Sequence, residues 1–336
     1  MRVLAPKSPE LMLETKDWRI LQELLSNIRQ PLSKVAKHIL LSRQSVEYRL
    51  AQLQQSNLIT GSRTVIDVRK LGYQSYHVFL EMHAPLQEKE LLERALNAPF
   101  VNALIIYSGK YNIELSLQCR SEEEFLSSYQ QLTSHLDVRN EVILTLLATL
   151  RSEVLPFGYF PNLKGFKLSY GLDKISKPSL PLSLDSTDVS ILHLLADDAQ
   201  ISKSSLAQKL KISKDTVSYR LQKLERHGYI LQYRPALNYA VLGLSINSIL
   251  FKVNSLPSQI GQFEGFLQSH GKVLWVTKTF GYYNYLAYVI TRDLEEFHEV
   301  INEVKEKFEN LIKTYEILFA YKELKYSFMA KSVKLR

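Results

Sequence analysis

Two stretches of this chain carry the side chains with which proteins hold double-stranded nucleic acid. Arginine and lysine neutralise phosphates, whereas glutamine, aspartate, serine and threonine hydrogen-bond to base edges, and each stretch combines both kinds. We predict DNA contacts from Arg43, Gln44, Ser45, Tyr48, Arg49, Gln52 and Arg63 in the first stretch, and from Lys203, Lys214, Asp215, Thr216, Tyr219, Arg220, Lys223 and Arg234 in the second.

The middle of each stretch has helical spacing. Counted at 100° per residue from the apolar Val46, the polar positions of the first stretch fall on the opposite side of a helix. Each stretch has four outward positions and one flanking position. They are Gln44, Tyr48, Gln52 and Gln55, flanked by Ser45, in the first stretch, and Asp215, Tyr219, Lys223 and Arg226, flanked by Thr216, in the second. Because the two outward sets differ, the two stretches are predicted to prefer different half-sites.

Arg49 and Arg220 lie beside the apolar stripe, where an arginine can clamp a backbone phosphate rather than read a base. The alternative is a structural ion pair with an acidic residue of the first helix of the same stretch, such as Glu23 in the first copy. The outward tyrosines could contact a sugar or phosphate, or cover the seam beside the helix. The remaining cations are phosphate candidates or plain solvated charges.

Three helices must position each set of side chains. Ile20, Leu21, Leu24 and Leu25 have helical spacing, and Pro31 suits the first turn of a second helix. Serines at 42 and 213 are placed to cap a third helix, which runs from 43 to about 55 in the first stretch. A two-stranded wing is expected next, with strands 58–59 and 65–66 joined across residues 61–62, and likewise from 229–230 to 236–237.

The two stretches are copies of one another. Residues 17–72 and 188–243 align without a gap at an offset of 171, with 16 identities over 56 positions. From Tyr76 each copy continues with alternating and helical patterns in the order βαββαβ, which is typical of a ferredoxin-like split βαβ domain. In this second part the offset becomes 172, as Gly109 and Gly281 show.

The pattern resembles the Lrp/AsnC family of transcription regulators, also called feast/famine regulators. The resemblance is carried by LDSTDVSIL from Leu184, by LAQKLKIS, by TVSYRLQKLERHGYI and by Leu242-Gly243. It implies a winged helix-turn-helix followed by a βαββαβ effector and assembly domain, and pairing between assembly domains. The chain departs from the usual plan because two complete units are fused, and because the first copy has Asn57 where the second has Gly228.

The resemblance also implies small effectors, such as amino acids, near the turns between central strands. The matching residues are Gly109, Tyr111, Asn112, Gly281, Tyr283 and Asn284. The family commonly has an acidic residue where both copies here carry asparagine, and an amide cannot neutralise an α-ammonium group. The alternative interpretation is that these segments are simply tight turns.

The totals agree with a DNA partner without requiring one. The net charge is +8 over 336 residues, the single cysteine excludes an internal disulfide, and no apolar run reaches 18 residues. We expect a cytoplasmic, nucleoid-associated protein with no membrane association, either a homo-oligomer or a pseudo-dimer within one chain. No Cys/His metal spacing, phosphate loop or nucleophile motif occurs, so we expect no catalytic residues, no metal and no cofactor.

Two other functions share this fold. One is a nucleoid organiser with little sequence preference; the other is a siroheme decarboxylase, an enzyme class built from similar paired units. The His-x-Tyr-x-Arg and Asn-x-Trp signature of that enzyme class does not follow either wing, where the strands read YHVFLEMH and INSILFKV. A sequence-specific regulator is therefore the preferred prediction.

These patterns predict an α+β chain in which two winged helix-turn-helix domains alternate with two ferredoxin-like (ACT-like) domains. The expected order is a lead-in at 1–16, helix-turn-helix domains at 17–72 and 184–243, assembly domains at 73–156 and 244–328, a linker at 157–183 and a tail at 329–336. The prolines and glycines of the linker favour irregular structure, although its aromatic residues suggest that part of it packs on a domain.

Overall fold

A computed structural model describes residues 2–3, 11–160, 183–254 and 257–335. The chain divides into two compact units. Of the described residues, the head unit takes 12–73, 183–238 and 327–335, and the barrel unit takes 2–3, 11, 74–160, 239–254 and 257–326. Each unit therefore combines corresponding parts of both repeats, rather than one repeat each.

The head unit contains three helices from each repeat, as expected. They are α1 (Thr15–Ser26), α2 (Leu32–Ile39) and α3 (Arg43–Gln55), followed by α6 (Ser186–Asp197), α7 (Lys203–Leu210) and α8 (Lys214–Arg226). The predicted caps are confirmed: Ser42 accepts a hydrogen bond from the Ser45 amide, and Ser213 accepts one from the Thr216 amide. Val46 and Val217 are fully buried, so the predicted apolar faces pack inward.

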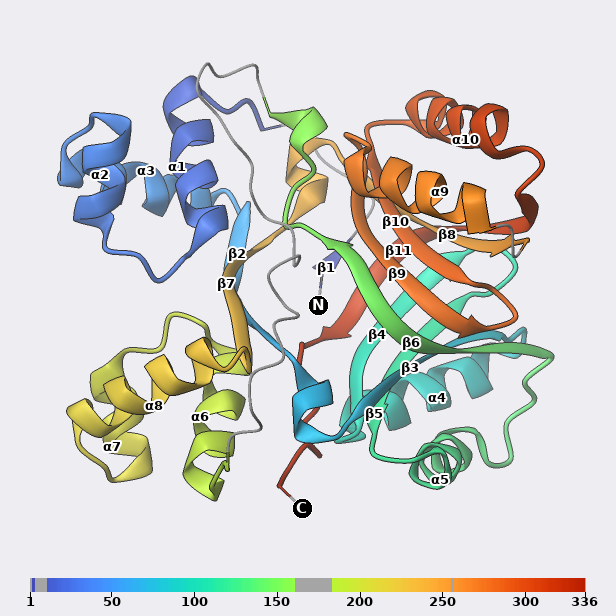
Figure 1. The fold of residues 1–336 in the computed structure, drawn as a ribbon, viewed down its shortest axis with the longest axis horizontal. Coiled ribbons are helices and arrows are strands. Elements are labelled where there is room, and N and C mark those ends of the chain that lie inside the picture. Colours follow the sequence, from blue (N-terminus) through green and yellow to red (C-terminus); the bar gives the residue numbers. More distant parts are fainter. Residues whose placement is uncertain (1, 4–10, 161–182, 255–256, 336) are drawn as a thin grey trace. The chain divides into compact units, whose positions relative to one another are not determined.

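The predicted hairpin wings are wrong. Each repeat contributes a single continuous strand, β2 (Ile59–Ile66) or β7 (Ile230–Leu237), and these two strands pair antiparallel with each other. Figure 1 shows β2 and β7 side by side. Gly61 and Ser62 remain in the strand because the equivalent strand of the other repeat supplies a partner along its whole length, which makes a turn unnecessary.

The paired strands join the two sets of helices. The Thr64 hydroxyl donates to the Leu195 carbonyl of α6, 2.7 Å away, and the Gln232 amide donates to the Leu25 carbonyl of α1, 3.0 Å away. Each strand therefore bonds to the first helix of the other repeat. Arg29 adds a further link, since its guanidinium donates to the Ile201 carbonyl just before α7.

The C-terminal tail also belongs to the head unit. Met329, Ala330 and Val333 are buried, and the Ser332 carbonyl accepts a hydrogen bond from the Tyr73 hydroxyl. The Val333 carbonyl lies 2.7 Å from His193 Nε2 of α6. The tail therefore contacts both repeats.

The barrel unit confirms the βαββαβ prediction twice. The first copy comprises β3 (Gln74–Glu81), α4 (Pro85–Asn97), β4 (Val101–Ser108), β5 (Ile113–Cys119), α5 (Glu122–Thr133) and β6 (Asn140–Ser152). The second comprises β8 (Ser245–Val253), α9 (Pro257–Ser269), β9 (Val273–Gly281), β10 (Tyr285–Thr291), α10 (Leu294–Phe308) and β11 (Ile312–Tyr326). Short 3-10 turns lie at Val68–Leu71, Phe157–Tyr159 and Tyr239–Leu242, and β1 (Arg2–Val3), within the predicted lead-in, pairs with β11.

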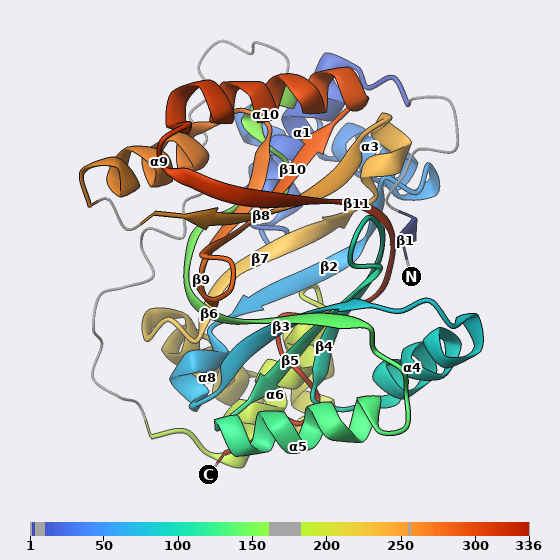
Figure 2. The ribbon, with the colours of Figure 1, turned by 90° about the vertical axis from the view of Figure 1, so that its right-hand side faces the viewer.

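The last strand of each copy is long, and it pairs first with a strand of its own copy and then with a strand of the other copy. The first part of β6 pairs with β3 and its later part pairs with β9, whereas β11 pairs with β8 and then with β4. Starting from β11, the strands follow the order β11-β4-β5-β3-β6-β9-β10-β8, and β8 pairs again with β11. The result is a closed antiparallel barrel with α4 and α5 on one side and α9 and α10 on the other (Figure 2).

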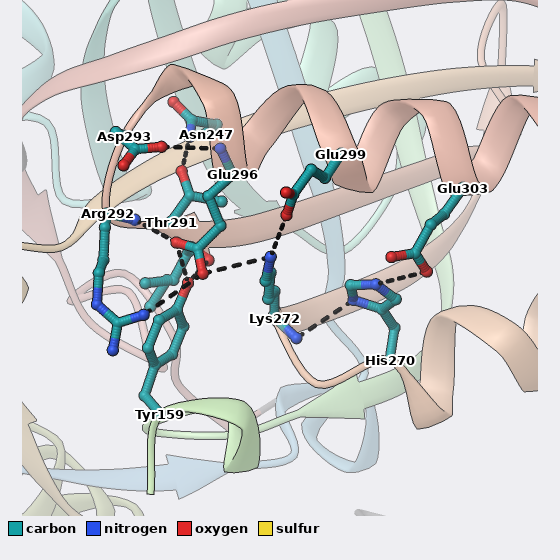
Figure 3. Close-up of polar contacts among 11 residues, drawn as sticks. Tyr159, Asn247, His270, Lys272, Thr291, Arg292, Asp293, Glu296, Glu299 and Glu303 are labelled. Carbon is teal, nitrogen blue, oxygen red and sulfur yellow. Dashed lines mark hydrogen bonds and ion pairs between the residues drawn. The ribbon is translucent and has the colours of Figure 1, made fainter.

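The described start of the linker packs on the second assembly domain, as the aromatic residues suggested. The buried Tyr159 hydroxyl donates to the Ile290 carbonyl at 2.6 Å and contacts Glu296, which also pairs with Lys272 and Arg292 (Figure 3). Burial and the nearby Glu296 charge raise the pKa of Tyr159 above its ordinary value. Residues 161–182 of the predicted linker lie outside the described residues. None of the described helices combines the length and apolar character needed to cross a bilayer.

Candidate nucleic-acid interface

The outward faces of α3 and α8 lie as the helical spacing predicted. Tyr48 is 65% exposed and Tyr219 is 66% exposed, so neither tyrosine covers an apolar seam. The other predicted base-reading positions are the exposed Gln44, Gln52 and Asp215 and the half-buried Lys223. Within α3, Gln52 donates a hydrogen bond to the Tyr48 hydroxyl at 2.9 Å, and the position of Gln52 is held by Lys223 in α8.

The two helices also differ at their first turns. Arg43 forms an ion pair with Glu47, with 2.7 Å between Nε and Oε1, whereas α8 has Lys214 and Ser218 at these positions. Lys203 of α7 is exposed, as Lys214 is. Ser45 and Thr216 are half-buried, and their amides are used by the helix caps. At the position of Glu47, four residues after the first cation, α8 therefore has Ser218 and no acid, although Asp215 is adjacent to Lys214.

Arg49 and Arg220 have intramolecular partners, although not the Glu23 suggested as an alternative. Arg49 pairs with Asp17 and Glu14 at 2.9 Å each, and Arg220 pairs with Asp188 and Asp185 at 2.8 Å each. Glu23 instead lies 3.3 Å from His38. The geometry favours the structural interpretation of both arginines over the phosphate clamp.

These ion pairs lock the start of the first helix in each repeat. Asp185 and Asp188 form a reciprocal capping box, and Glu14 and Asp17 form the corresponding one. The backbone amide of Asp188 and the Arg220 guanidinium lower the pKa of Asp185. The hydrogen bond to Asp188 raises the pKa of Arg220, and the bond to Asp17 does the same for Arg49.

The assignment of Arg234 as a phosphate contact is wrong. Its side chain is buried because β7 pairs along its length, and it donates to Gln232 at 2.6 Å and lies over the Phe328 ring. Arg63 is its direct partner across the β2–β7 ladder and is half-buried. A projecting hairpin would have carried both arginines toward solvent. In the sheet that β2 and β7 share, Arg234 is buried and Arg63 is half-buried.

The predicted effector residues have structural contacts in the barrel unit. A Cβ on Gly109 would lie 3.0 Å from the Ile317 carbonyl oxygen, and one on Gly281 would lie 2.5 Å from the Ile143 carbonyl oxygen. Each glycine therefore permits close approach of the last strand of the other copy, and both have positive φ, +151° and +142°. This approach brings strands together and supplies a reason for glycine that needs no ligand.

The two asparagines hold strand ends together. Asn112 accepts from the Met82 amide and donates to both the Met82 carbonyl and Glu88, each at 2.9 Å. Asn284 accepts from the Val253 amide at 2.9 Å. Tyr111 and Tyr283 are buried. Burial is the main cause that raises the pKa of Tyr283, and the neighbouring Tyr111 raises it further. The contacts of these residues are contacts within the chain, and they account for the residue types without a ligand.

One polar cluster was missed by the sequence reasoning. Glu114 on β5 is 1% exposed, although it alternates with core residues as a solvent-facing side chain would. Barrel closure buries this second face of the strand. The only signal was the polar series Glu114, Ser116 and Gln118, which an open sheet would have left in water.

Comparison with known proteins defines the class of the two helix sets, α1–α3 and α6–α8, which we call the first and the second head. The winged helix-turn-helix DNA-binding family matches residues 13–60 and 184–230. The chain is 31% identical over 124 residues to the proline dehydrogenase transcriptional activator of Rhizobium radiobacter, covering 36% of this chain and 78% of that protein. It is 26% identical over 121 residues to the regulator LrpC of Bacillus subtilis, covering 36% and 83%. The two helix sets are winged helix-turn-helix DNA-binding domains in which the paired strands β2 and β7 take the place of two separate hairpin wings.

Each of these relatives matches about one repeat's length, which agrees with a fusion of two units. The chain belongs to the Lrp/AsnC family of transcription regulators. Its whole two-unit fold is similar to that of the siroheme decarboxylase NirDL, with a TM-score of 0.60, 14% identity, and coverage of 96% of this chain and 94% of that one. At this identity the likeness concerns the fold.

Proposed function

We propose that this protein is a transcription regulator in which a single chain reads an asymmetric operator with two different heads. The observation that supports it most directly is the β2–β7 pairing, which joins both helix sets in one head unit. In a homodimer, two identical heads would prefer a palindrome. Here the joined heads differ, so the preferred site has two unlike halves.

The difference lies in the side chains that face outward from α3 and α8. Tyr48 and Tyr219 occupy the same place in both, and such tyrosines can contact the backbone without distinguishing sequence. The neighbouring position carries Gln52 in one head and Lys223 in the other, and glutamine suits adenine whereas lysine suits guanine. Binding specificity therefore differs between heads although their scaffolds agree.

Selection of bound sequences from a random DNA pool tests this proposal. The expected result is two half-sites of different sequence, separated by about one helical turn, roughly 34 Å. Recovery of a perfect palindrome with equal preference at both halves would contradict it. Competition between the selected site and random DNA separates a regulator from a nucleoid organiser, which would lose little binding on scrambling the site.

We further propose DNA binding, rather than catalysis, as the activity of the chain. Apart from the signature missing from the sequence, His77 on β3 and His83 just after this strand have local partners. His77 Nδ1 lies 2.6 Å from Glu114, and His83 Nε2 lies 2.8 Å from Glu81. Absorbance spectra of the protein mixed with siroheme test the alternative, because a shifted absorption band followed by turnover would overturn this part of the proposal.

The proposal includes a small effector, such as an amino acid, at the turns Gly109–Asn112 and Gly281–Asn284. Family membership supports it. Because the Asn112 amide is already bonded to Met82 and Glu88, such a ligand would use the backbone of the turn. Thermal shifts with a panel of free amino acids test it: an increase in Tm at millimolar ligand is expected, and no shift across the panel would remove the effector from the proposal.

A further inference from the structure

The barrel interior holds a buried polar cluster built by both repeats. At its centre, Glu114 Oε1 is 2.6 Å from His77 Nδ1 and accepts from the Tyr288 hydroxyl at 2.7 Å. Glu114 Oε2 accepts from the Tyr107 hydroxyl at 2.5 Å, and that hydroxyl also lies 2.9 Å from the Ser248 hydroxyl. Tyr288 and Ser248 come from the second repeat, so two of these contacts join the repeats.

The cluster is not repeated by the pseudo-symmetry of the barrel. At the offset of 172 that relates Gly109 to Gly281, Glu114 corresponds to Leu286 and Ser116 corresponds to Tyr288. The contact between Glu114 and Tyr288 therefore corresponds to one between Leu286 and Ser116, an apolar side chain facing a hydroxyl. The carboxylate and its tyrosine donor are present once, with one on each repeat.

Pairing of identical repeats would break this complementarity. Two second repeats would place each Tyr288 hydroxyl against Leu286, without its carboxylate. Two first repeats would bury two Glu114 carboxylates in one barrel, each facing Ser116 instead of Tyr288. Tyr288 would lose its acceptor in the first case, and Glu114 would lose one of its donors in the second while keeping His77 and Tyr107. A buried polar group left without a partner costs more than the bond contributes net when formed.

We propose that the Glu114–Tyr288 contact is a pairing lock that makes the two assembly domains of this chain fit each other better than either fits a copy of itself. In a fused chain, identical repeats can pair only between chains, and such pairing would link chains into larger assemblies. The lock favours the barrel that is made of one first repeat and one second repeat. This inference concerns the barrel unit and does not depend on DNA binding.

Paired cysteines in the full chain distinguish the two kinds of barrel. Ser108 of β4 is the strand partner of Phe319 of β11, so the S108C/F319C pair reports a first repeat paired with a second. At the other junction of the barrel, Phe280 of β9 takes the place of Ser108, and its strand partner Thr145 of β6 takes the place of Phe319. In a barrel made of two first repeats, Ser108 of one chain would therefore lie opposite Thr145 of the other. The S108C/T145C pair reports this pairing between chains. Within one chain β5 and β3 separate Ser108 from Thr145 by about 14 Å, too far for a disulfide.

The test variant is Tyr288→Phe, and Tyr285→Phe is its matched control. Both tyrosines lie on β10 and donate to a buried or half-buried carboxylate, but the Tyr285 hydroxyl bonds to Glu264 of the same repeat at 2.6 Å. Each protein is unfolded in denaturant, refolded at high concentration and oxidised. The native Cys119 is fully buried and stays in place.

We expect Tyr288→Phe to increase the S108C/T145C cross-linked dimer by roughly tenfold or more, since a hydrogen bond to a charged group favours one pairing by that order. Tyr285→Phe should leave the dimer fraction as in the parent. Glu114→Leu, which copies Leu286, should raise it as Tyr288→Phe does. Equal dimer fractions for Tyr288→Phe and Tyr285→Phe would overturn the lock, and this comparison stands even if Glu114→Leu fails to fold.

Discussion

The guanidinium of Arg220 lies 2.8 Å from the carboxylate of Asp188, whose side chain is 1% exposed. The pair connects α8 to the first turn of α6, and Arg49 makes the corresponding link from α3 to Asp17. The helix proposed to face DNA is therefore held to the first helix of its repeat by charge as well as by apolar packing. Removing the arginine would leave a buried carboxylate without its cation.

Arg220→Ala should accordingly lower the free energy of unfolding by about 2–4 kcal/mol, because one partner of a largely buried pair is lost. Urea denaturation measures this, with Arg226→Ala at the exposed end of the same helix as the control, expected to change stability by less than about 0.5 kcal/mol. The salt dependence of DNA binding should keep its slope. A slope reduced by about one, with stability unchanged, would instead restore the phosphate clamp.

Acid should weaken the head unit through Asp185. Its pKa is lowered in the folded protein, so its ionised form stabilises the fold above the unfolded value of 3.8, and this contribution disappears as the pH falls through the folded pKa. We expect the stability of the parent to fall as the pH drops below about 4, and Asp185→Asn to show a smaller fall while keeping the helix cap. Urea midpoints across this range measure the difference; parallel curves for both proteins would contradict it.

Exchange of outward residues should change the operator. In the double variant Asp215→Gln/Lys223→Gln, the second head presents the glutamines that the first head has at Gln44 and Gln52. Each altered base contact is worth about 1–3 kcal/mol of discrimination, so the selected site should become more nearly palindromic. Exchanging the exposed Lys209 in the last turn of α7 for glutamine is the control. An operator unchanged by the double variant would show that α8 does not read bases.

Alanine at the two strand-crossing glycines should destabilise the barrel unequally. The added Cβ would lie 2.5 Å from a carbonyl oxygen at Gly281 but 3.0 Å from one at Gly109, and both residues have positive φ. We expect a loss of about 2–4 kcal/mol for Gly281→Ala and less for Gly109→Ala. Gly265→Ala in α9, where a Cβ meets nothing within 4 Å, should stabilise by about 0.5–1 kcal/mol. Thermal or urea unfolding ranks the three, and a larger loss at Gly109 would contradict the steric argument.

Local patterns predicted the elements well because the two repeats reinforce each other. Helix caps at Ser42 and Ser213, the inward Val46 and Val217, and both βαββαβ orders follow from spacing and short-range hydrogen bonding alone. The exposed Tyr48 and Tyr219 follow in the same way, since their place on the helix is fixed by the apolar stripe.

The sequence patterns did not predict which strands pair between the two repeats. Gly61-Ser62 has the composition of a turn, and only a partner strand from the other repeat keeps it extended. The same long-range pairing buries Arg234 and Glu114, each of which reads as an exposed charge in its own strand. Arg49 and Arg220 illustrate a smaller difficulty, because helical spacing indicates that they lie near the first helix but does not select the acid that binds them.

The strands β2 and β7 belong to one polypeptide, so the proposed single-chain regulator implies a particular dependence of operator occupancy on protein concentration. A regulator assembled from two chains must first associate, so its active fraction falls steeply when few copies are present. In this protein the two heads are synthesised together in equal number, and their union does not depend on concentration. Occupancy should therefore follow the copy number of the chain in simple proportion at low levels, without a threshold set by dimerisation.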